Sequence, residues 1–473
     1  MKSKVLAAVL AASIASAPLT AGAWETSTHT GLAEQAALAA QLDAHLRALG
    51  VSGGLFEPLT IPPADAKELT EALARHSPSG GYVPDARGRQ YALAWLLAGA
   101  ALADSTATWA ANHFFDPRTG AGWKAPRDGM VRSLTDRAQG ATQPPPAGMP
   151  ALEWVTSPQN PLNYQGFLDQ YEKALRAPSP GERSRHLAGA LIAAGAILHV
   201  LGDMASPSRV RGDAAAHEDT VGVDPADRGS RFERLAAIAW GRLGVPAAPR
   251  TVSAPTLRAF FVGDGGQVEG LAVWTSTQFF SPGTLPRAID IGNTRRDDLS
   301  GVLTRSLTRP APTVPRRLSL MKAGQPGGAT LKGTGGVCLA RYGVAHGQLS
   351  WWLDDECLVA QAQAILPVAA AYEAGLLRWL FRGDLRLAQP DGGPVTVTVH
   401  GTPLGKGTLT LLAEDGRGVR TPFATVEVAA GADGAVVATS PVPADAHKVI
   451  ASFRGVDAAG EAVVAAGVLD LGA

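Results

Sequence analysis

The sequence predicts a mainly α-helical chain that ends in a small all-β domain. Apolar residues recur at helical spacing through most of the first 383 residues, and turns rich in proline and glycine separate these segments. After Gly383 the period changes to the alternation typical of strands. We therefore expect a helical domain over residues 24–383, followed by an immunoglobulin-like β-sandwich over residues 384–473.

Residues 1–23 have the pattern of a secretory signal. Two lysines precede an apolar run from Val5 to Ile14, and small residues close the segment at positions 21–23. This run is too short to span a bilayer, and the sequence shows no other uninterrupted apolar stretch of about 18 residues, so we expect no transmembrane helix. The signal predicts an exported protein, secreted or periplasmic, whose mature chain begins at Trp24.

The helical period places the expected helices and the loops between them. The expected helices are Gly31–Leu49, Ala64–Arg75, Gln90–Ala103, Ser179–Leu201, Ser230–Leu243 and Leu358–Phe381. The fourth has a clear start, because Ser179 can cap it, Pro180 fits the first helical position and Glu182 completes a capping box. It is apolar nearly all round and should be buried. Residues 116–122 and 143–150 are turn-rich insertions, and residues 295–336 read as loops or a hairpin.

Short strands and two cysteines complete the expected architecture. The expected strands are Val395–His400, Gly407–Leu412, Val419–Val428, Val436–Ser440 and Val449–Phe453. Cys338 and Cys357 are the two cysteines of the chain, and an oxidising compartment favours joining them in a disulfide. Two isolated buried thiols are the alternative.

The charge balance argues against a polyanionic partner. Lys plus Arg and Asp plus Glu both number 42, so the formal net charge is zero. No strongly basic block is present to hold a nucleic-acid backbone or an anionic membrane by general electrostatics. We expect no nucleic-acid partner.

The clearest chemical signal is a histidine and an aspartate on one face of a helix. His199 and Asp203 are four residues apart in a segment made otherwise of Ala, Leu, Ile, Val and Gly. Burying both is costly unless they pair with each other or with a metal ion. For the pair alone, a direct hydrogen bond explains the pattern as well as metal ligation does.

Further candidate ligands favour the metal. His113 lies in His113-Phe114-Phe115-Asp116-Pro117 and follows an Ala-rich helix that carries Asp104; imidazole nitrogen and carboxylate oxygen are ligands that zinc accepts. Signal cleavage would free the α-amine of Trp24, which a cation can bind together with the Trp24 carbonyl oxygen. His29 follows five residues later.

Two other side chains are ambiguous on sequence alone. Glu233 is the acid of Ser230-Arg231-Phe232-Glu233, which also spells a capping box. His217 lies in a polar loop and is equally well explained as a surface residue.

In this order the motifs resemble those of the zinc-dependent bacterial phospholipases C, which share a fold with the single-strand-specific zinc nucleases. The resemblance covers about residues 24–383. It implies a cluster of zinc ions that binds a phosphodiester and activates water. Trp24 and His29 would bind one zinc, and His113 and His199 would bind a second. Asp203 would bridge the two ions.

The resemblance also implies roles for two further acids, with one departure from the family pattern. Asp104 would be a metal ligand or the general base, and Glu233 would belong to a third zinc. The family usually places a histidine where this chain has Arg209, and a guanidinium cannot ligate a cation and repels it. Two or three zinc ions are therefore expected. Either His217 replaces the missing ligand, or Arg209 grips a phosphate oxygen, or the site is degenerate.

Three functions follow from these patterns. The first is a secreted phospholipase C-like phosphodiesterase, with a phospholipid substrate and peripheral contact with a membrane surface. The second is a zinc nuclease of the same fold, acting on single-stranded nucleic acid or nucleotides, which the balanced charge disfavours. The third is a non-catalytic secreted binding protein with a degenerate metal site, for which Arg209 is the best support.

Overall fold

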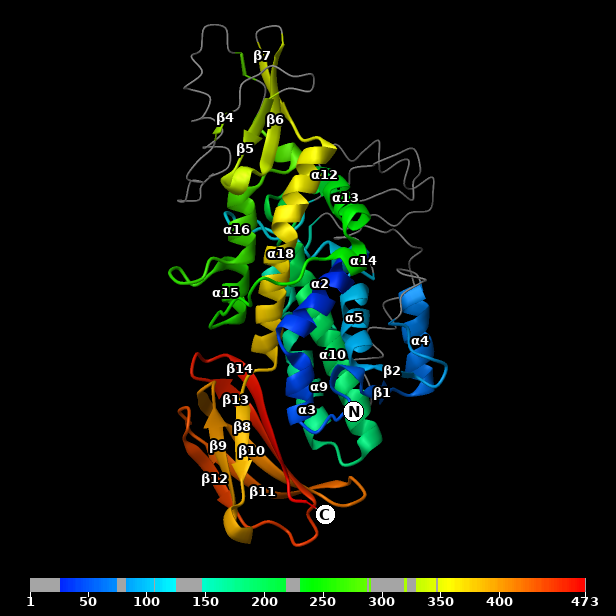
Figure 1. The fold of residues 1–473 in the computed structure, drawn as a ribbon, viewed down its shortest axis with the longest axis vertical. Coiled ribbons are helices and arrows are strands. Elements are labelled where there is room, and N and C mark those ends of the chain that lie inside the picture. Colours follow the sequence, from blue (N-terminus) through cyan, green and yellow to red (C-terminus); the bar gives the residue numbers. More distant parts are fainter. Residues whose placement is uncertain are drawn as a thin grey trace.

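The computed structural model describes residues 26–74, 82–105, 107–124, 147–217, 230–286, 289–290, 319–320, 329–345 and 348–472. Figure 1 shows an elongated molecule in which a bundle of helices lies between two sheets. A five-stranded sheet is at one end and a seven-stranded β domain is at the other. The predicted fold class, a mainly helical part followed by a β-sandwich, is confirmed.

The helices of the bundle vary widely in length. Before the central helix they are α2 (Thr26–Ala39), α3 (Leu42–Ala48), α4 (Pro63–Ala74), α5 (Ala92–Leu102), α6 (Ala107–Ala110), α8 (Ala151–Trp154) and α9 (Tyr164–Arg176). From the central helix onward they are α10 (Pro180–Asp203), α11 (Pro207–Val210), α12 (Ala214–His217), α13 (Arg231–Ala239), α14 (Gly241–Gly244), α15 (Leu257–Val262), α16 (Leu271–Gln278) and α18 (Asp355–Leu380). A two-stranded ribbon of β1 (Pro58–Thr60) and β2 (Arg89–Tyr91) lies beside them.

Two of the predicted helices are each divided in two. The segment 31–49 breaks at Gln41, which has a left-handed backbone with φ 59° and separates α2 from α3. The segment 230–243 breaks at Gly241, with φ 48°. Hydrophobic spacing continues across both breaks, so the period alone did not reveal them. The Ser179–Glu182 capping box at the start of α10 is confirmed.

The core is built around α10, which packs against α5, α9 and α18. Glycines let α5 and α10 approach very closely. A β-carbon on Gly195 would lie 1.9 Å from the Leu96 carbonyl oxygen, and one on Gly99 would lie 2.0 Å from the Ile192 carbonyl oxygen. No side chain fits at either position, so the two backbones are in direct contact.

Two helices are long and apolar enough to cross a membrane by length and composition alone. These are α10 and α18, and 89% and 67% of their most apolar 18-residue windows are buried inside the fold. This burial is that of core helices. It agrees with the expectation from sequence that the helix beginning near Ser179 is buried on nearly all sides.

The five-stranded sheet lies in the region expected to contain loops or a hairpin and extends beyond it. Its order is β3-β7-β6-β5-β4, from β3 (Ile289–Asp290), β4 (Ser319–Leu320), β5 (Ala329–Lys332), β6 (Cys338–Ala345) and β7 (Gln348–Trp352). Much of residues 295–336 lies outside the described residues. The predicted disulfide is confirmed: Cys338 at the start of β6 is joined to Cys357 in the first turn of α18. It ties the sheet to that helix.

The C-terminal domain has seven strands in the order β11-β10-β13-β14-β8-β9-β12. They are β8 (Asp384–Ala388), β9 (Val395–His400), β10 (Leu404–Glu414), β11 (Arg420–Val428), β12 (Val436–Ser440), β13 (Lys448–Asp457) and β14 (Ala462–Asp470). All neighbours are antiparallel except β14 and β8, which meet at one parallel pair, Ala466 and Asp384. Apolar residues from all seven strands form one buried cluster, which is the interior of the sandwich.

Polar contacts and shared packing join the two parts of the chain. Arg382, just after α18, lies 2.9 Å from the Asp457 carboxylate and 2.9 Å from the Ala462 carbonyl oxygen. Its guanidinium also stacks on Trp379, 3.7 Å from the ring centroid. The large core cluster of the helices includes Ala466 of β14. The sandwich is therefore packed firmly against the base of the bundle.

Candidate metal centre

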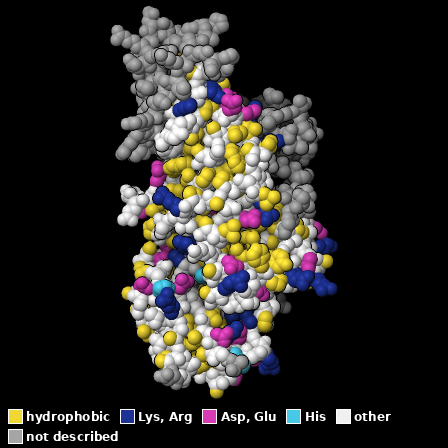
Figure 2. All heavy atoms as spheres, in the orientation of Figure 1, with side chains coloured by type: hydrophobic (Ala, Val, Ile, Leu, Met, Phe, Trp, Pro, Cys, Tyr) yellow, Lys and Arg dark blue, Asp and Glu magenta, His cyan; other side chains and the backbone are white. Residues whose placement is uncertain are grey.

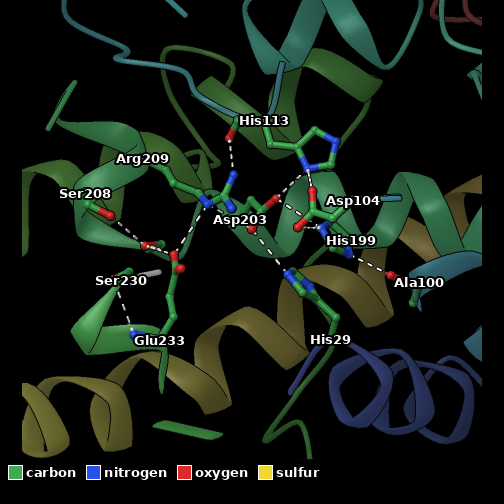
Figure 3. Close-up of polar contacts among 11 residues, drawn as sticks. His29, Ala100, Asp104, His113, His199, Asp203, Ser208, Arg209, Ser230 and Glu233 are labelled. Carbon is green, nitrogen blue, oxygen red and sulfur yellow. Dashed lines mark hydrogen bonds and ion pairs between the residues drawn. The ribbon is translucent and has the colours of Figure 1, made fainter. Parts of the chain in front are cut away.

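The last turn of α10 presents His199 and Asp203 on one buried face, as predicted. They are 3% and 0% exposed. His199 Nδ1 lies 2.7 Å from the carbonyl oxygen of Ala100 on α5, so the ring donates there and its Nε2 points at Asp203 (Figure 3). Because a carbonyl oxygen can only accept, this contact fixes the tautomer and leaves Nε2 to face the centre. The close packing of α5 on α10 creates this arrangement.

Two segments beyond α5 bring Asp104 and His113 to the same point. His113 Nδ1 lies 2.8 Å from Asp104 Oδ1 and 2.9 Å from Asp203 Oδ2. His199 Nε2 lies 3.3 Å from both Asp104 Oδ2 and Asp203 Oδ2. Ligand atoms from these four residues all lie within 4.8 Å of one another. The structure thus gathers two imidazoles and two carboxylates into a group that can hold a metal ion.

Asp203 is the carboxylate that the whole centre shares. Its Oδ2 faces His113 and His199, whereas its Oδ1 lies 3.3 Å from His29 Nε2 on α2. The His29 and His199 rings stack with centroids 3.4 Å apart. The two oxygens therefore face different imidazoles, which is the geometry that a bridging carboxylate needs.

The side chains of the centre shift one another's pKa values strongly. Burial favours a neutral ring at His199, but the Asp104 and Asp203 carboxylates outweigh it and raise the His199 pKa to about 10. Burial opposes ionisation of Asp104, yet the two neighbouring imidazoles hold its pKa well below the usual value. Burial, followed by repulsion from His199, lowers the pKa of His29 to about 4. Protonated His199 lies beside both carboxylates, and the Arg209 guanidinium is the larger positive influence on Asp203.

The donor set fits a zinc ion. Two ligands about 2.0–2.1 Å from a tetrahedral zinc lie roughly 3.3 Å from each other. Three of the separations, His199 Nε2 to each aspartate and His29 Nε2 to Asp203, are 3.3 Å. The shorter His113 contacts would have to open by a few tenths of an ångström. The nitrogen and oxygen ligands, their burial and the fixed His199 tautomer all suit this ion.

Zinc uptake should release at least one proton. His199 is protonated at neutral pH in the metal-free protein because its pKa is raised to about 10, and a ligating Nε2 must lose that proton. The apparent zinc affinity should therefore rise about tenfold per pH unit between pH 7 and 9. Titration calorimetry in two buffers of different protonation enthalpy measures this release. Equal heats in both buffers would contradict the prediction.

Arg209 and Glu233 lie on the other side of Asp203. The Arg209 Nε is 3.3 Å from Asp203 Oδ1 and 3.4 Å from Glu233 Oε1, and the side chain is fully buried (Figure 3). Glu233 Oε1 also accepts a 2.6 Å hydrogen bond from Ser206. Burial raises the pKa of Glu233 to about 8, although Arg209 opposes this shift. A guanidinium thus lies between the two carboxylates.

The Glu233 carboxylate is not occupied in a capping box. Ser230 caps α13 by accepting from the Glu233 backbone nitrogen at 3.4 Å, but the Glu233 carboxylate turns inward to Ser206 and Arg209. Residues 230–233 therefore cap α13 through Ser230 and place the Glu233 carboxylate at the centre.

Most of the residues expected at the site converge in the structure. The converging residues are His29, Asp104, His113, His199, Asp203, Arg209 and Glu233, from segments far apart in the chain. Trp24 and the signal segment lie outside the described residues. His217 ends α12, and its side chain is not among those described.

Sequence analysis missed one acid beside the centre. Glu373 on α18 is 1% exposed, and its Oε1 lies against Gly202, one residue before Asp203. The signal that could have found it is a single ionisable residue on the apolar stretch Val368–Leu377, where every other side chain is apolar except that of Tyr372.

Comparisons with known proteins give matches only among solved structures. No family model matches the chain, and no curated protein matches it. The chain is similar to the alpha toxin from Clostridium absonum, with 10% identity and a TM-score of 0.26, and to the alpha-toxin from an avian strain of Clostridium perfringens, with 10% identity and a TM-score of 0.27. Both matches cover 95% of this chain and 99% of the toxin. Similarity this weak gives no ground for transferring an activity or a ligand to this chain.

Proposed function

We propose that this chain is an exported, metal-dependent phosphodiesterase that hydrolyses the head-group phosphodiester of phospholipids. The observation that carries the proposal is the buried group of Asp104, His113, His199 and Asp203. Asp203 also contacts His29 and Arg209 through Oδ1. The order of the sequence motifs, which resembles that of the zinc-dependent phospholipases C, supports the same reaction. A bound zinc pair would polarise phosphoryl oxygens and lower the pKa of a water molecule.

Two side chains of the centre suit proton transfer and phosphate binding. Asp104 and Asp203 are the two carboxylates of the four-residue group. The Asp104 side chain is 14% exposed and that of Asp203 is 0% exposed. Asp104 is therefore the better placed of the two to accept a proton from the attacking water. Arg209 is oriented by Asp203 and Glu233, and its Nη2 has no hydrogen-bond partner among the described residues. That nitrogen can donate to a phosphoryl oxygen as negative charge develops there.

The surface supports a lipid substrate more than a nucleic acid. Figure 2 shows Lys and Arg side chains interspersed with Asp and Glu on the described part of this face, with no broad area of one sign. A nucleic-acid strand needs a positive track along its backbone. Ile238 on α13 and Leu243 on α14 are 77% and 95% exposed, and apolar side chains of this kind suit peripheral contact with lipid.

The test is hydrolysis by the purified mature chain supplied with zinc. Choline phospholipid in mixed micelles and single-stranded DNA would be offered in parallel, and the released phosphoester products would be quantified. We expect head-group release that chelation abolishes and zinc restores. Cleavage of DNA alone would favour the nuclease. Bound zinc without hydrolysis of either substrate would identify a binding protein in which Arg209 has replaced a catalytic ion.

A further inference from the structure

A cavity of about 430 Å³ lies where the helical part of the chain meets the β domain. Residues of α3, α9 and α10 line it from the helical part, and residues of β10, β11, β13 and β14 line it from the sandwich. Pockets of this volume bind small molecules and occur preferentially at interfaces between domains. The described residues that line the cavity include none of the metal centre, so the proposed reaction gives the cavity no role.

The lining from the helical part is mainly apolar. Four leucines, all 8% exposed or less, line the cavity there: Leu46, Leu49, Leu59 and Leu187. A hydrocarbon chain placed against them would leave water, which is favourable in proportion to the apolar area removed. This side of the cavity therefore suits an aliphatic group.

The charged part of the lining holds two arginines that share one carboxylate. Arg420 Nε lies 2.7 Å from Glu414 Oε2, and Arg183 Nη2 lies 3.5 Å from the same oxygen. The side chains of Arg420, Arg183 and Glu414 are 10%, 15% and 12% exposed, so water screens their charges poorly. Burial, followed by repulsion from Arg420, lowers the pKa of Arg183, although Glu414 opposes this shift. One positive charge thus remains here without an acid to balance it.

The remaining polar groups leave this excess positive charge in place. Glu57 and Lys448 also line the cavity and are opposite in sign. Asp470, which lies 3.8 Å from Lys448, is 68% exposed and therefore screened by water. Arg420 uses Nε and Nη1 in its hydrogen bonds to the protein, whereas its Nη2 has no partner among the described residues and is not buried. An anion in the cavity can accept from that nitrogen without displacing a protein contact.

We propose that the cavity binds a monovalent anion with one hydrocarbon chain, a fatty acid, whose carboxylate pairs with Arg420 and Arg183 and whose chain lies against the leucines. The single excess charge favours a carboxylate over a phosphate monoester, which carries about 1.5 to 2 negative charges at neutral pH and would be repelled by Glu414. An uncharged chain would leave the arginines unbalanced, and a small anion would leave the leucines uncovered. The inference does not depend on the proposed reaction, because no residue of the metal centre takes part.

The test measures binding of laurate to the purified mature chain by titration calorimetry, below the concentration at which laurate forms micelles. Acetate supplies the head group alone, and dodecyltrimethylammonium supplies a chain of similar length with a positive head group. We expect laurate to bind and to raise the melting temperature, because a ligand of the folded state stabilises that state. Acetate and dodecyltrimethylammonium should each bind at least about tenfold more weakly. Binding of either one as tight as that of laurate would overturn the proposal.

Two arginines of one hairpin provide matched variants. Arg420→Gln removes a charge from the cavity, and Arg417→Gln removes one whose side chain is 88% exposed, in the turn that precedes β11. We expect Arg420→Gln to weaken laurate binding by about 10–100-fold, which is the range expected for the loss of a hydrogen bond to a charged group. Arg417→Gln should match the wild type.

A variant on the apolar side keeps the test independent of the contacts that Arg420 makes with the protein. Leu49→Trp extends a larger side chain into the cavity and leaves every charge in place. Its laurate affinity should fall at least about tenfold, with the melting temperature measured without laurate confirming that it folds. A folded Leu49→Trp protein that binds laurate as tightly as the wild type would contradict the proposal, as would equal laurate affinity in Arg420→Gln and Arg417→Gln. No arm measures phosphodiester hydrolysis, so failure here would leave the proposed function intact.

Discussion

Replacing Asp203 with asparagine should eliminate both zinc binding at the four-residue group and phosphodiester hydrolysis. The carboxylate contacts His29 and Arg209 through Oδ1, and His113 and His199 through Oδ2. An amide keeps the volume but offers one oxygen and no charge, so it cannot face both sides of the centre. Loss of a residue that merely orients a ligand costs about 10–100-fold in affinity or activity, and loss of the shared ligand should cost more. Bound zinc and initial rates measure the effect.

A nearby aspartate provides the control for this experiment. Asp116 belongs to the same motif as His113 and is 7% exposed, but its carboxylate pairs with Arg118 at 2.7 Å. Asp116→Asn should retain zinc and activity. His199→Ala should behave like Asp203→Asn. Activity close to the wild-type rate in either of those two variants would show that the reaction takes place elsewhere.

Adding one methyl group at Gly195 should destabilise the protein by about 3 kcal/mol. The new β-carbon would lie 1.9 Å from the carbonyl oxygen of Leu96, a backbone atom that no rotamer change can move. The two helices α5 and α10 must separate to admit it. The same shift pulls His199 away from the carbonyl oxygen of Ala100, so zinc affinity should fall as well. Urea denaturation followed by the helical circular dichroism signal measures the loss of stability.

Gly181→Ala is the matched control because Gly181 lies on the same helix with open space around it. There the substitution replaces a poor helix former with a good one and should stabilise the protein by about 0.5–1 kcal/mol. A Gly195→Ala protein as stable as Gly181→Ala would mean that the helices are not held in contact by their glycines.

The sequence was most informative where local chemistry and tertiary packing agree. The capping box at Ser179 and the apolar run after it located α10 almost to the residue, and strict alternation located β9 and β12. The breaks at Gln41 and Gly241 were missed because they depend on single backbone angles that leave the hydrophobic spacing intact. The amphipathic helix α9 and the strands β6, β7, β8 and β14 were not anticipated.

Most of the residues expected at the site lie together in the structure, but the contacts between them were not predicted. Spacing and residue type identified His113, His199 and Asp203, because a histidine and a carboxylate on an apolar helix need partners. That Arg209 lies between Asp203 and Glu233, or that Gly202 admits Glu373, depends on how distant helices cross. No local pattern encodes such crossings, and the involvement of Trp24 stays a prediction.

The junction between α18 and the β domain has a further consequence. Gly383 has φ 94°, and a β-carbon there would lie 2.7 Å from Ala465 of β14, while Val464 and Ala466 of the same strand belong to the large core of the helices. The core of the helices thus reaches one face of β14, while the interior of the sandwich is a separate cluster. Removal of the sandwich would expose this apolar contact to water, so we expect the folding free energies of the two parts to be coupled.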